Sequence, residues 1–153
     1  MGIEAKFRKE DVRGRLDMFL WRVQKRQIER LRLLGEMCVN HARSIPKEQG
    51  FEDQTGNLRS SIGYSVFFDS VAIHSSYEVV LGGDAGAKAG QRLAQAIGEQ
   101  TEGVCLVVTA GMTYALYLES KGRDVLTSAE HLAEKELPKM LEKFIDNIRK
   151  SGE

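Results

Sequence analysis

The sequence has few of the residues from which small catalytic and metal sites are built. It holds two cysteines and three histidines in 153 residues. Cys38 and Cys105 form no CxxC pair and lie within apolar patterns, so we expect buried, reduced thiols in a cytosolic protein. His41, His74 and His131 are scattered over different predicted elements, where structural or surface positions suit them best. We therefore expect no metal and no cofactor.

Catalytic motifs are also missing. Lys88 lies in a glycine-rich segment, but alanines flank it where a phosphate-binding loop needs a preceding glycine and a following serine or threonine. No serine occupies a Gly-x-Ser-x-Gly elbow, and no acidic pair is typical of a general acid and base. The sequence predicts a protein that is not an enzyme, with a small hydrolase as the residual alternative.

An excess of one charge and long apolar runs are absent as well. Basic and acidic residues number 22 each, so the whole chain has no field that would attract nucleic acid or an anionic membrane. No run approaches the roughly 18 apolar residues of a membrane span, and no signal-peptide pattern is present, so we expect a soluble protein. Residues 1–50 nevertheless carry twelve basic and seven acidic side chains. This basic front and acidic back favour self-association at least as well as DNA binding.

Proline is scarce, which leaves room for long helices. Apolar side chains recur three or four positions apart over residues 11–45, and this spacing predicts one long helix that Pro46 ends. Such a helix would be about 50 Å long, which exceeds the span of a compact domain of this size. It either breaks near Gly14 or Gly35 or projects from the domain. We expect residues 1–10, which precede it, to be disordered.

The middle of the chain is rich in β-branched and aromatic residues, which predict strands, with Asp69 and Ser70 as a hairpin turn. The expected strands are residues 60–69, 71–74, 78–81 and 104–109. Residues 82–90 are glycine-rich and predict a flexible loop, followed by a short helix at 92–99.

The last third of the chain is helical again. Thr127-Ser128-Ala129-Glu130 fits a capping box, and Pro138 predicts a kink or a restart within the helix that follows. The order of elements gives an α+β fold in a single domain over residues 1–153. It combines a long N-terminal helix, an antiparallel or mixed sheet of about four strands, a short helix and a kinked C-terminal helix.

Two short runs are more specific than the rest of the chain. Thr55-Gly56-Asn57-Leu58-Arg59-Ser60-Ser61-Ile62 predicts a turn that starts a strand. Tyr114-Ala115-Leu116-Tyr117-Leu118-Glu119, followed by Gly122, predicts a short amphipathic helix. In this helix the two tyrosines and Leu118 would face a sheet, while Glu119 reaches solvent or a neighbouring subunit.

Together with the long first helix, a strand ending at Gly111 and the C-terminal helix, these runs resemble the tailed-phage tail-component family. Its members are small neck and tail-completion proteins that join head to tail. The resemblance implies a structural phage or prophage protein that forms a homo-oligomeric ring at the head-tail junction and contacts other connector and tail proteins. It also implies the bacterial cytoplasm during assembly and the virion neck or tail afterwards.

A ring subunit needs two complementary surfaces, which the basic first helix and the acidic remainder could supply. Trp21 is either an interface anchor or a core residue, and Arg59 and Glu119 are either solvated or paired between subunits. The candidate interface residues are Trp21, Arg22, Arg26, Arg59, Tyr114, Tyr117 and Glu119.

The alternative function is a nucleic-acid-binding module that uses the basic side chains of the first helix to contact phosphates. These residues are Arg22, Lys25, Arg26, Arg30 and Arg32. In the ring hypothesis, contact with DNA is secondary.

Overall fold

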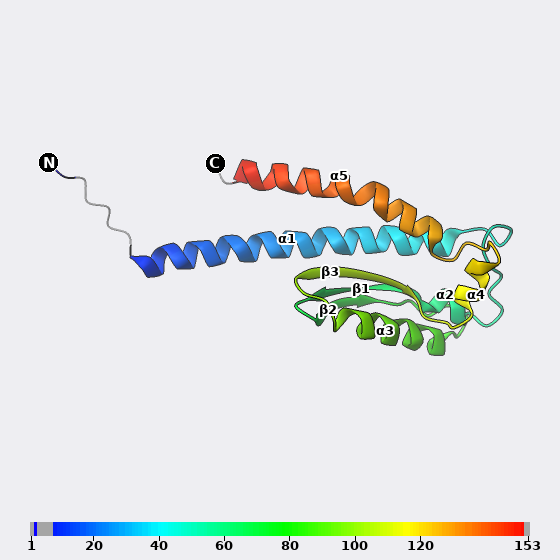
Figure 1. The fold of residues 1–153 in the computed structure, drawn as a ribbon. Helices are drawn as coiled ribbons and strands as arrows, with labels where there is room; N and C mark the ends of the chain where they lie inside the picture. The colour runs from blue at the N-terminus through cyan, green and yellow to red at the C-terminus, as the bar shows by residue number, and fades with distance from the viewer. Residues whose placement is uncertain (1, 3–7, 152–153) are drawn as a thin grey trace.

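The dominant feature of the computed structural model, which describes residues 2 and 8–151, is the 36-residue helix α1 (Lys9–Ser44). Figure 1 shows α1 extending well beyond the rest of the fold at its N-terminal end. The predicted long helix is confirmed, and it ends just before Pro46. Of the two alternatives, a break at Gly14 or Gly35 is wrong, and the helix projects instead.

The disorder expected for residues 1–10 is wrong at Lys9 and Glu10, which belong to α1. Residues 1 and 3–7 of that range lie outside the described residues.

Three antiparallel strands form the sheet. β1 (Ile62–Phe68) lies in the centre, between β2 (Val71–Ser76) and β3 (Val104–Ala110). β1 and β2 form the expected hairpin, and its turn residues Asp69 and Ser70 both have positive φ. This is the backbone that a two-residue turn with the right strand twist requires.

The fourth expected strand, residues 78–81, is wrong. The segment is an irregular connection whose backbone groups bond to side chains instead of to a neighbouring strand. Arg43 donates to the Glu78 carbonyl at 2.9 Å, and the Val80 amide donates to the Ser60 hydroxyl at 2.8 Å. These backbone groups already have hydrogen-bond partners from side chains. The segment therefore does not pair with a strand, although its apolar composition favours one.

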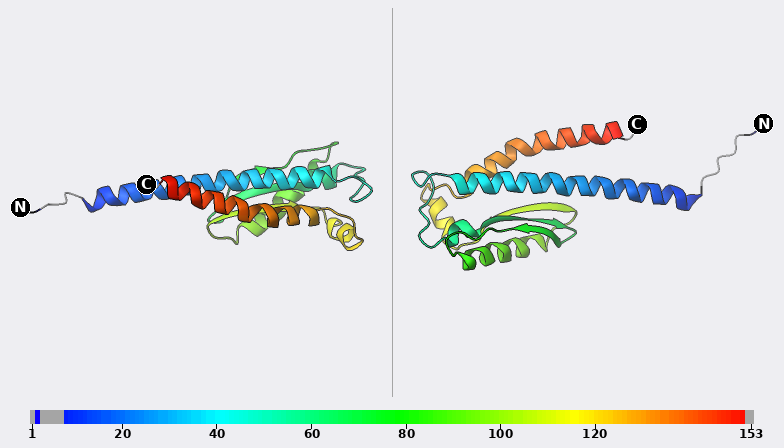
Figure 2. Two further views of the ribbon diagram at one scale, coloured as in Figure 1. Left: turned by 90° about the horizontal axis from the view of Figure 1, so that it is seen from above. Right: turned by 180° about the vertical axis from the view of Figure 1, so that it is seen from behind.

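Both faces of the sheet are covered by helices. α1 lies on one face, α3 (Asp84–Gly98) on the other, and α5 (Thr127–Ser151) packs on the outer side of α1. The right-hand view of Figure 2 shows the same order of layers. β1 is therefore buried on both sides, with Tyr64 and Val66 in the cluster under α1 and Phe67 in the cluster at α3. The fold is α+β with an antiparallel sheet.

α3 begins within the segment that was predicted to be a flexible loop. Residues 84–90 are helical because glycines allow α3 to approach α2 (Asn57–Ser61) and the sheet closely. A Cβ on Gly86 would overlap the Asn57 carbonyl, and a Cβ on Gly98 would overlap the Phe67 ring. Glycine lowers intrinsic helix propensity, but here the packing that it permits decides the structure.

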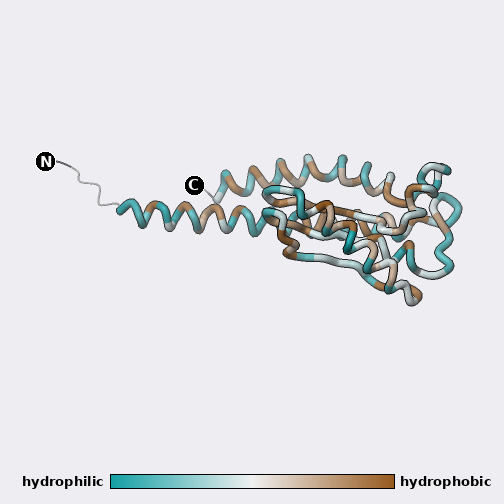
Figure 3. The backbone as a smooth tube through the Cα atoms, turned by 60° about the horizontal axis from the view of Figure 1, so that its bottom comes forward, coloured by the Kyte–Doolittle hydropathy of each residue, from teal (hydrophilic) through white to brown (hydrophobic). Residues whose placement is uncertain are grey.

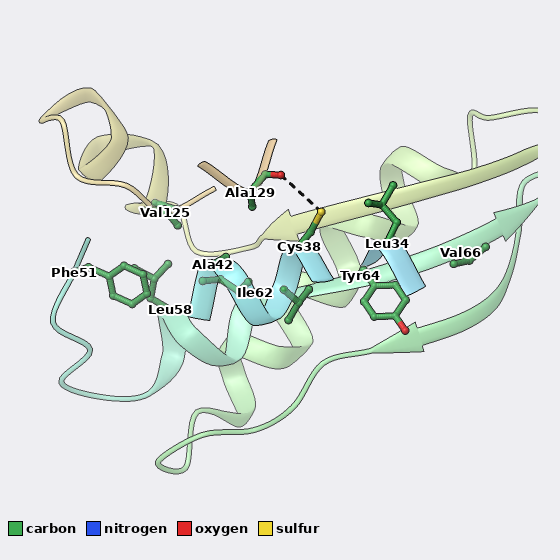
Figure 4. Close-up of a cluster of buried hydrophobic side chains, with 12 residues drawn as sticks. Leu34, Cys38, Ala42, Phe51, Leu58, Ile62, Tyr64, Val66, Val125 and Ala129 are labelled. Carbon is green, nitrogen blue, oxygen red and sulfur yellow. Dashed lines mark hydrogen bonds between the residues drawn. The ribbon is translucent and has the colours of Figure 1, made fainter. Parts of the chain in front are cut away.

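The larger core lies between α1, the sheet and the start of α5, as Figure 4 shows. Gly35 is part of this contact, since an added Cβ would stand 2.5 Å from the Cδ2 atom of Tyr64. Cys38 is buried as expected, and burial raises the pKa of its thiol. Cys105 is only half-buried, which corrects the expectation for that residue.

Two further predictions concern element boundaries. The Thr55–Ile62 run does not enter a strand directly, because Asn57–Ser61 first forms α2, and Gly56 precedes it with a φ of 77°. α5 continues through Pro138 without a restart, and Figure 1 shows its axis bending along its length.

Candidate interaction surfaces

No element in the described part of the chain covers the N-terminal part of α1. α5 runs antiparallel to the C-terminal part of α1, and both α5 and the sheet stop short of its first turns (Figures 1 and 2). We call residues 9–23 the projecting segment. Six large apolar side chains on it are at least 41% exposed: Val12, Leu16, Met18, Phe19, Leu20 and Trp21.

Most of these side chains share one side of the helix. Residues three, four and seven positions apart lie on the same face, and Figure 3 shows apolar positions recurring along this part of α1. We call Val12, Leu16, Phe19, Leu20 and Val23 the apolar stripe. Further along, the same side of α1 carries Leu34 and Cys38, and Cys38 contacts the Ala129 carbonyl of α5. Contiguous exposed apolar surface marks an interaction site in most soluble proteins.

Basic side chains flank the apolar stripe. Arg15, Arg22 and Arg26 are exposed and share a face, since they are seven and four positions apart. Lys25 lies 5.3 Å above the ring of Trp21. Within residues 8–151 the ion pairs are Arg43 with Glu78 and Lys139 with Glu136. The arginines of the projecting segment thus have no carboxylate partner in the described part of the chain.

A groove of about 660 Å³ lies where α1, α5 and β3 meet. β3 is an edge strand of the sheet, so one side of the groove is open. Arg30 and Glu130 stand among the lining residues, and Leu141 is 49% exposed. The other walls are mainly apolar and include Leu31, Leu34, Val104, Leu106, Leu137 and Phe144.

Tyr114 and Tyr117 lie at the opposite end of the molecule from the projecting segment, around α4 (Ala115–Ser120) (Figure 1). The prediction that they face a sheet is wrong. Tyr117 is 61% exposed, with Lys121 5.5 Å above its ring, and Tyr114 is 40% exposed. Ala115 is buried and Leu118 packs against the larger core, so these two side chains attach the short helix.

Glu119 points into its own chain, so the expectation that it reaches solvent or another subunit is wrong. Its Oε1 atom accepts hydrogen bonds from the amides of Val125, Leu126 and Thr127 at 3.0, 2.6 and 3.1 Å. Its Oε2 atom accepts one from the Thr127 hydroxyl at 2.6 Å. Partial burial acts to raise the pKa of Glu119, but these hydrogen bonds outweigh burial and lower the pKa below its ordinary 4.5.

These contacts replace the predicted capping box at the start of α5. The Thr127 hydroxyl donates to Glu119, and the Glu130 amide bonds to the Leu126 carbonyl at 2.8 Å. Asp124 accepts from the Ser128 amide at 3.1 Å. The carboxylates that satisfy the first turn therefore come from α4 and from the loop before α5, not from within α5.

Arg59 lies on α2 with its guanidinium 5.7 Å from the ring of Phe51. Its Nε atom is buried and has no hydrogen-bond partner in the described part of the chain. Asp53, the nearby carboxylate, accepts instead from the amides of Gly56 and Arg59 at 2.9 and 2.8 Å. Arg59 thus packs on an aromatic ring and is not simply solvated.

A polar network that the sequence did not predict ties α1 to the sheet. The Tyr64 hydroxyl donates to Glu36 Oε1 at 2.8 Å, and His74 Nε2 lies 3.1 Å from the same hydroxyl. Burial, and next the contact with Glu36, raise the pKa of Tyr64 to about 12, so the phenol stays protonated. Burial and then the charge of Arg32 lower the pKa of His74. We interpret the network as a structural link.

Replacing Tyr64 by phenylalanine is expected to lower the free energy of unfolding by about 1–2 kcal/mol, because the hydrogen bond to Glu36 is lost while the ring still packs. Urea denaturation measures the loss. Tyr117→Phe is the control, since the Tyr117 ring is largely exposed and should change the free energy by less than about 0.5 kcal/mol. Equal effects for the two variants would contradict a stabilising network.

No family model, curated protein or solved structure matches this chain. Among the described residues, no helix combines the length and apolar character needed to cross a membrane. In the same part of the chain, no three His, Cys, Asp or Glu side chains are grouped as metal ligands.

The structure separates the predicted interface residues into two groups at opposite ends of the molecule (Figure 1). Trp21 and Arg22 lie on the projecting segment and Arg26 just after it, whereas Arg59 and the residues around α4 lie at the far end. Sequence reasoning missed the apolar stripe and the groove as surfaces. The signal was present as helical periodicity, but that pattern was used only to predict the helix and not the surface that the helix exposes.

Proposed function

We propose that the protein is a structural component of the head-tail junction of a phage or prophage. In this proposal it assembles into a homo-oligomeric ring, in the bacterial cytoplasm during assembly and in the virion neck or tail afterwards, and contacts connector and tail proteins. It is not an enzyme. Two lines of reasoning support the proposal: the family resemblance of the Thr55–Ile62 and Tyr114–Gly122 runs, and the uncovered projecting segment.

The projecting segment is the observation that carries the proposal. A helix with Leu16 54% and Trp21 61% exposed has much apolar surface in water, which favours a state in which a partner covers it. The flanking arginines suit the rim of a protein interface, where Arg and aromatic residues are enriched. Because a monomer offers different surfaces at its two ends, contacts between copies can be heterologous and can close into a ring.

Light scattering on the purified chain tests this function. We expect a mass several times that of one copy, rising with concentration toward a ring such as a hexamer. Because some assembly proteins associate only on the growing particle, the measurement is repeated with heads or tails of the same phage. A chain that stays monomeric at high concentration, and also when these particles are added, contradicts the proposal. Portal, capsid and tail-tube genes beside its own would support it.

DNA binding by α1 is the second candidate, favoured by exposed arginines that have no carboxylate partner in the described residues. If Arg22 and Arg26 contact phosphates, affinity for a labelled duplex falls steeply with salt. Replacing both by glutamine should reduce the slope of log affinity against log salt by about 2. Lys88→Gln on α3 is the control and should leave the slope unchanged. No salt-sensitive binding at low ionic strength would exclude this function.

A further inference from the structure

We propose that the groove between α1, α5 and β3 receives the projecting segment of a second copy of this chain, so that copies dock head to tail. This inference rests on the proposed self-assembly and adds the two surfaces that meet. The apolar stripe of one copy enters the groove of the next, and the basic residues beside the stripe reach the acidic edge of α5.

No segment within residues 8–151 fills the groove. Its walls are apolar and its volume is about 660 Å³, yet it stays open beside the edge strand β3. The apolar stripe lies on the same helix as one groove wall, but α1 runs without a break from Lys9 to Ser44. A continuous helix cannot fold back on itself, so the stripe reaches a groove only in another copy.

The groove is long enough for the apolar stripe. Val12 and Val23 at the ends of the stripe are eleven positions apart, and the groove lining on α5 runs over fifteen positions, from Ala129 to Phe144. At the helical rise of 1.5 Å per residue, the stripe spans about 16 Å and the α5 wall about 22 Å. The whole stripe can therefore lie along the α5 wall, where helix-in-groove packing would place side chains at every turn.

The charges set the direction of docking. Glu130 and Glu134 lie on the same edge of α5 as Leu137 and Leu141, since these residues follow at spacings of four and three. Arg22 and Arg26 lie at the C-terminal end of the apolar stripe. A segment that enters antiparallel to α5 brings these arginines to the acidic end of the groove.

Arg30 of the receiving copy also lines the groove, so it competes for Glu130. Glu134, one turn further along and exposed, is then the second carboxylate for the incoming arginines. The charged rim thus fixes the orientation, while the apolar walls supply most of the buried surface.

Mixing two variants tests this arrangement. The helix variant carries Leu16→Glu and Phe19→Glu, and the groove variant carries Leu141→Arg at a half-exposed position that should not disturb folding. We expect each variant alone to be monomeric by light scattering. A mixture should form a complex of two copies, one of each kind, because one intact projecting segment meets one intact groove.

Matched controls keep the test specific. Met18→Glu changes a side chain that is 59% exposed on another side of α1, and Leu116→Arg changes one that is 79% exposed on α4. Both controls should assemble like the unmodified chain. Circular dichroism of every variant verifies that the helices are intact.

The outcomes separate this inference from the proposed function. An unmodified chain that never self-associates overturns the proposed function and this inference together. Self-association that Leu141→Arg leaves unchanged, or paired variants that do not combine, overturns head-to-tail docking alone. The latter result would assign the apolar stripe to pairing with a second stripe or with another protein.

A disulfide trap gives an independent measurement. A Leu16→Cys chain is mixed with a Leu141→Cys chain, and diamide is added to accept the two electrons and two protons released when the thiols join. We expect a band of two linked copies on a non-reducing gel. Met18→Cys in place of Leu16→Cys should give much less of it, and equal yields would contradict the docking geometry.

Discussion

Alanine at Gly86 is expected to lower the free energy of unfolding by about 3 kcal/mol, at the upper end of the cost of overpacking a core. The added Cβ would overlap the carbonyl of Asn57 in α2. This obstacle is backbone, so no side-chain rotation relieves it, and α3 must move away from α2 and the sheet. Urea denaturation followed by circular dichroism measures the loss.

Gly14→Ala is the matched control in the projecting segment of α1. No atom lies within 4 Å of the Cβ that it adds, and the helix continues on both sides. Alanine favours helix over glycine by up to about 1 kcal/mol, so the free energy of unfolding should stay the same or rise slightly. If Gly86→Ala cost less than about 1 kcal/mol, the close approach of α3 and α2 would not be required for folding.

Replacement of Glu119 by alanine should cost about 2–3 kcal/mol of unfolding free energy, because one carboxylate accepts four hydrogen bonds at the start of α5. Without it, three amides and the Thr127 hydroxyl lose their acceptor. We expect the start of α5 to fray, which hydrogen exchange at Leu126 and Thr127 would detect. Protection at these amides that survives the substitution would contradict the assigned role of Glu119.

The same carboxylate predicts a pH dependence. Folding lowers the pKa of Glu119 below 4.5, so its contribution is fully present above about pH 4.5 and is lost as pH falls through the folded-state value. The difference in unfolding free energy between the unmodified chain and Glu119→Gln should therefore shrink below about pH 4.5. Glu142→Gln, at an exposed position of α5, serves as the control and should show no such trend.

Elements whose signals lie in neighbouring residues of the sequence were predicted correctly. The apolar spacing of residues 11–45 and the stop at Pro46 gave α1, and Asp69-Ser70 gave the hairpin. Elements that depend on contacts between residues far apart in the sequence were not predicted. The helix at 84–90 depends on Gly86 and Gly90, which meet Asn57 and Ser61, and the cap of α5 depends on a carboxylate eight positions before Thr127. Such contacts leave no periodic signal in the chain.

The exposed surfaces could not be predicted from the sequence either. An apolar stripe at helical spacing looks identical whether the chain's own sheet or another molecule covers it, so Leu16 and Leu34 could not be told apart by sequence. In the structure Leu34 is 2% exposed and Leu16 is 54% exposed. The difference arises because α5 and the sheet are shorter than α1, a property of element lengths and not of any motif.

The close crossing of α1 over β1 at Gly35 has a mechanical consequence. From this crossing, α1 extends 26 residues to Lys9 and nine residues to Ser44, which makes arms of about 39 and 14 Å. A tilt of about 5° at Gly35 would thus move the helix tip by about 3 Å, more than twice the displacement at the other end. The close contact between Gly35 and the Tyr64 ring lies at the pivot of this tilt, so the packing at one residue without a side chain affects the position of the helix tip.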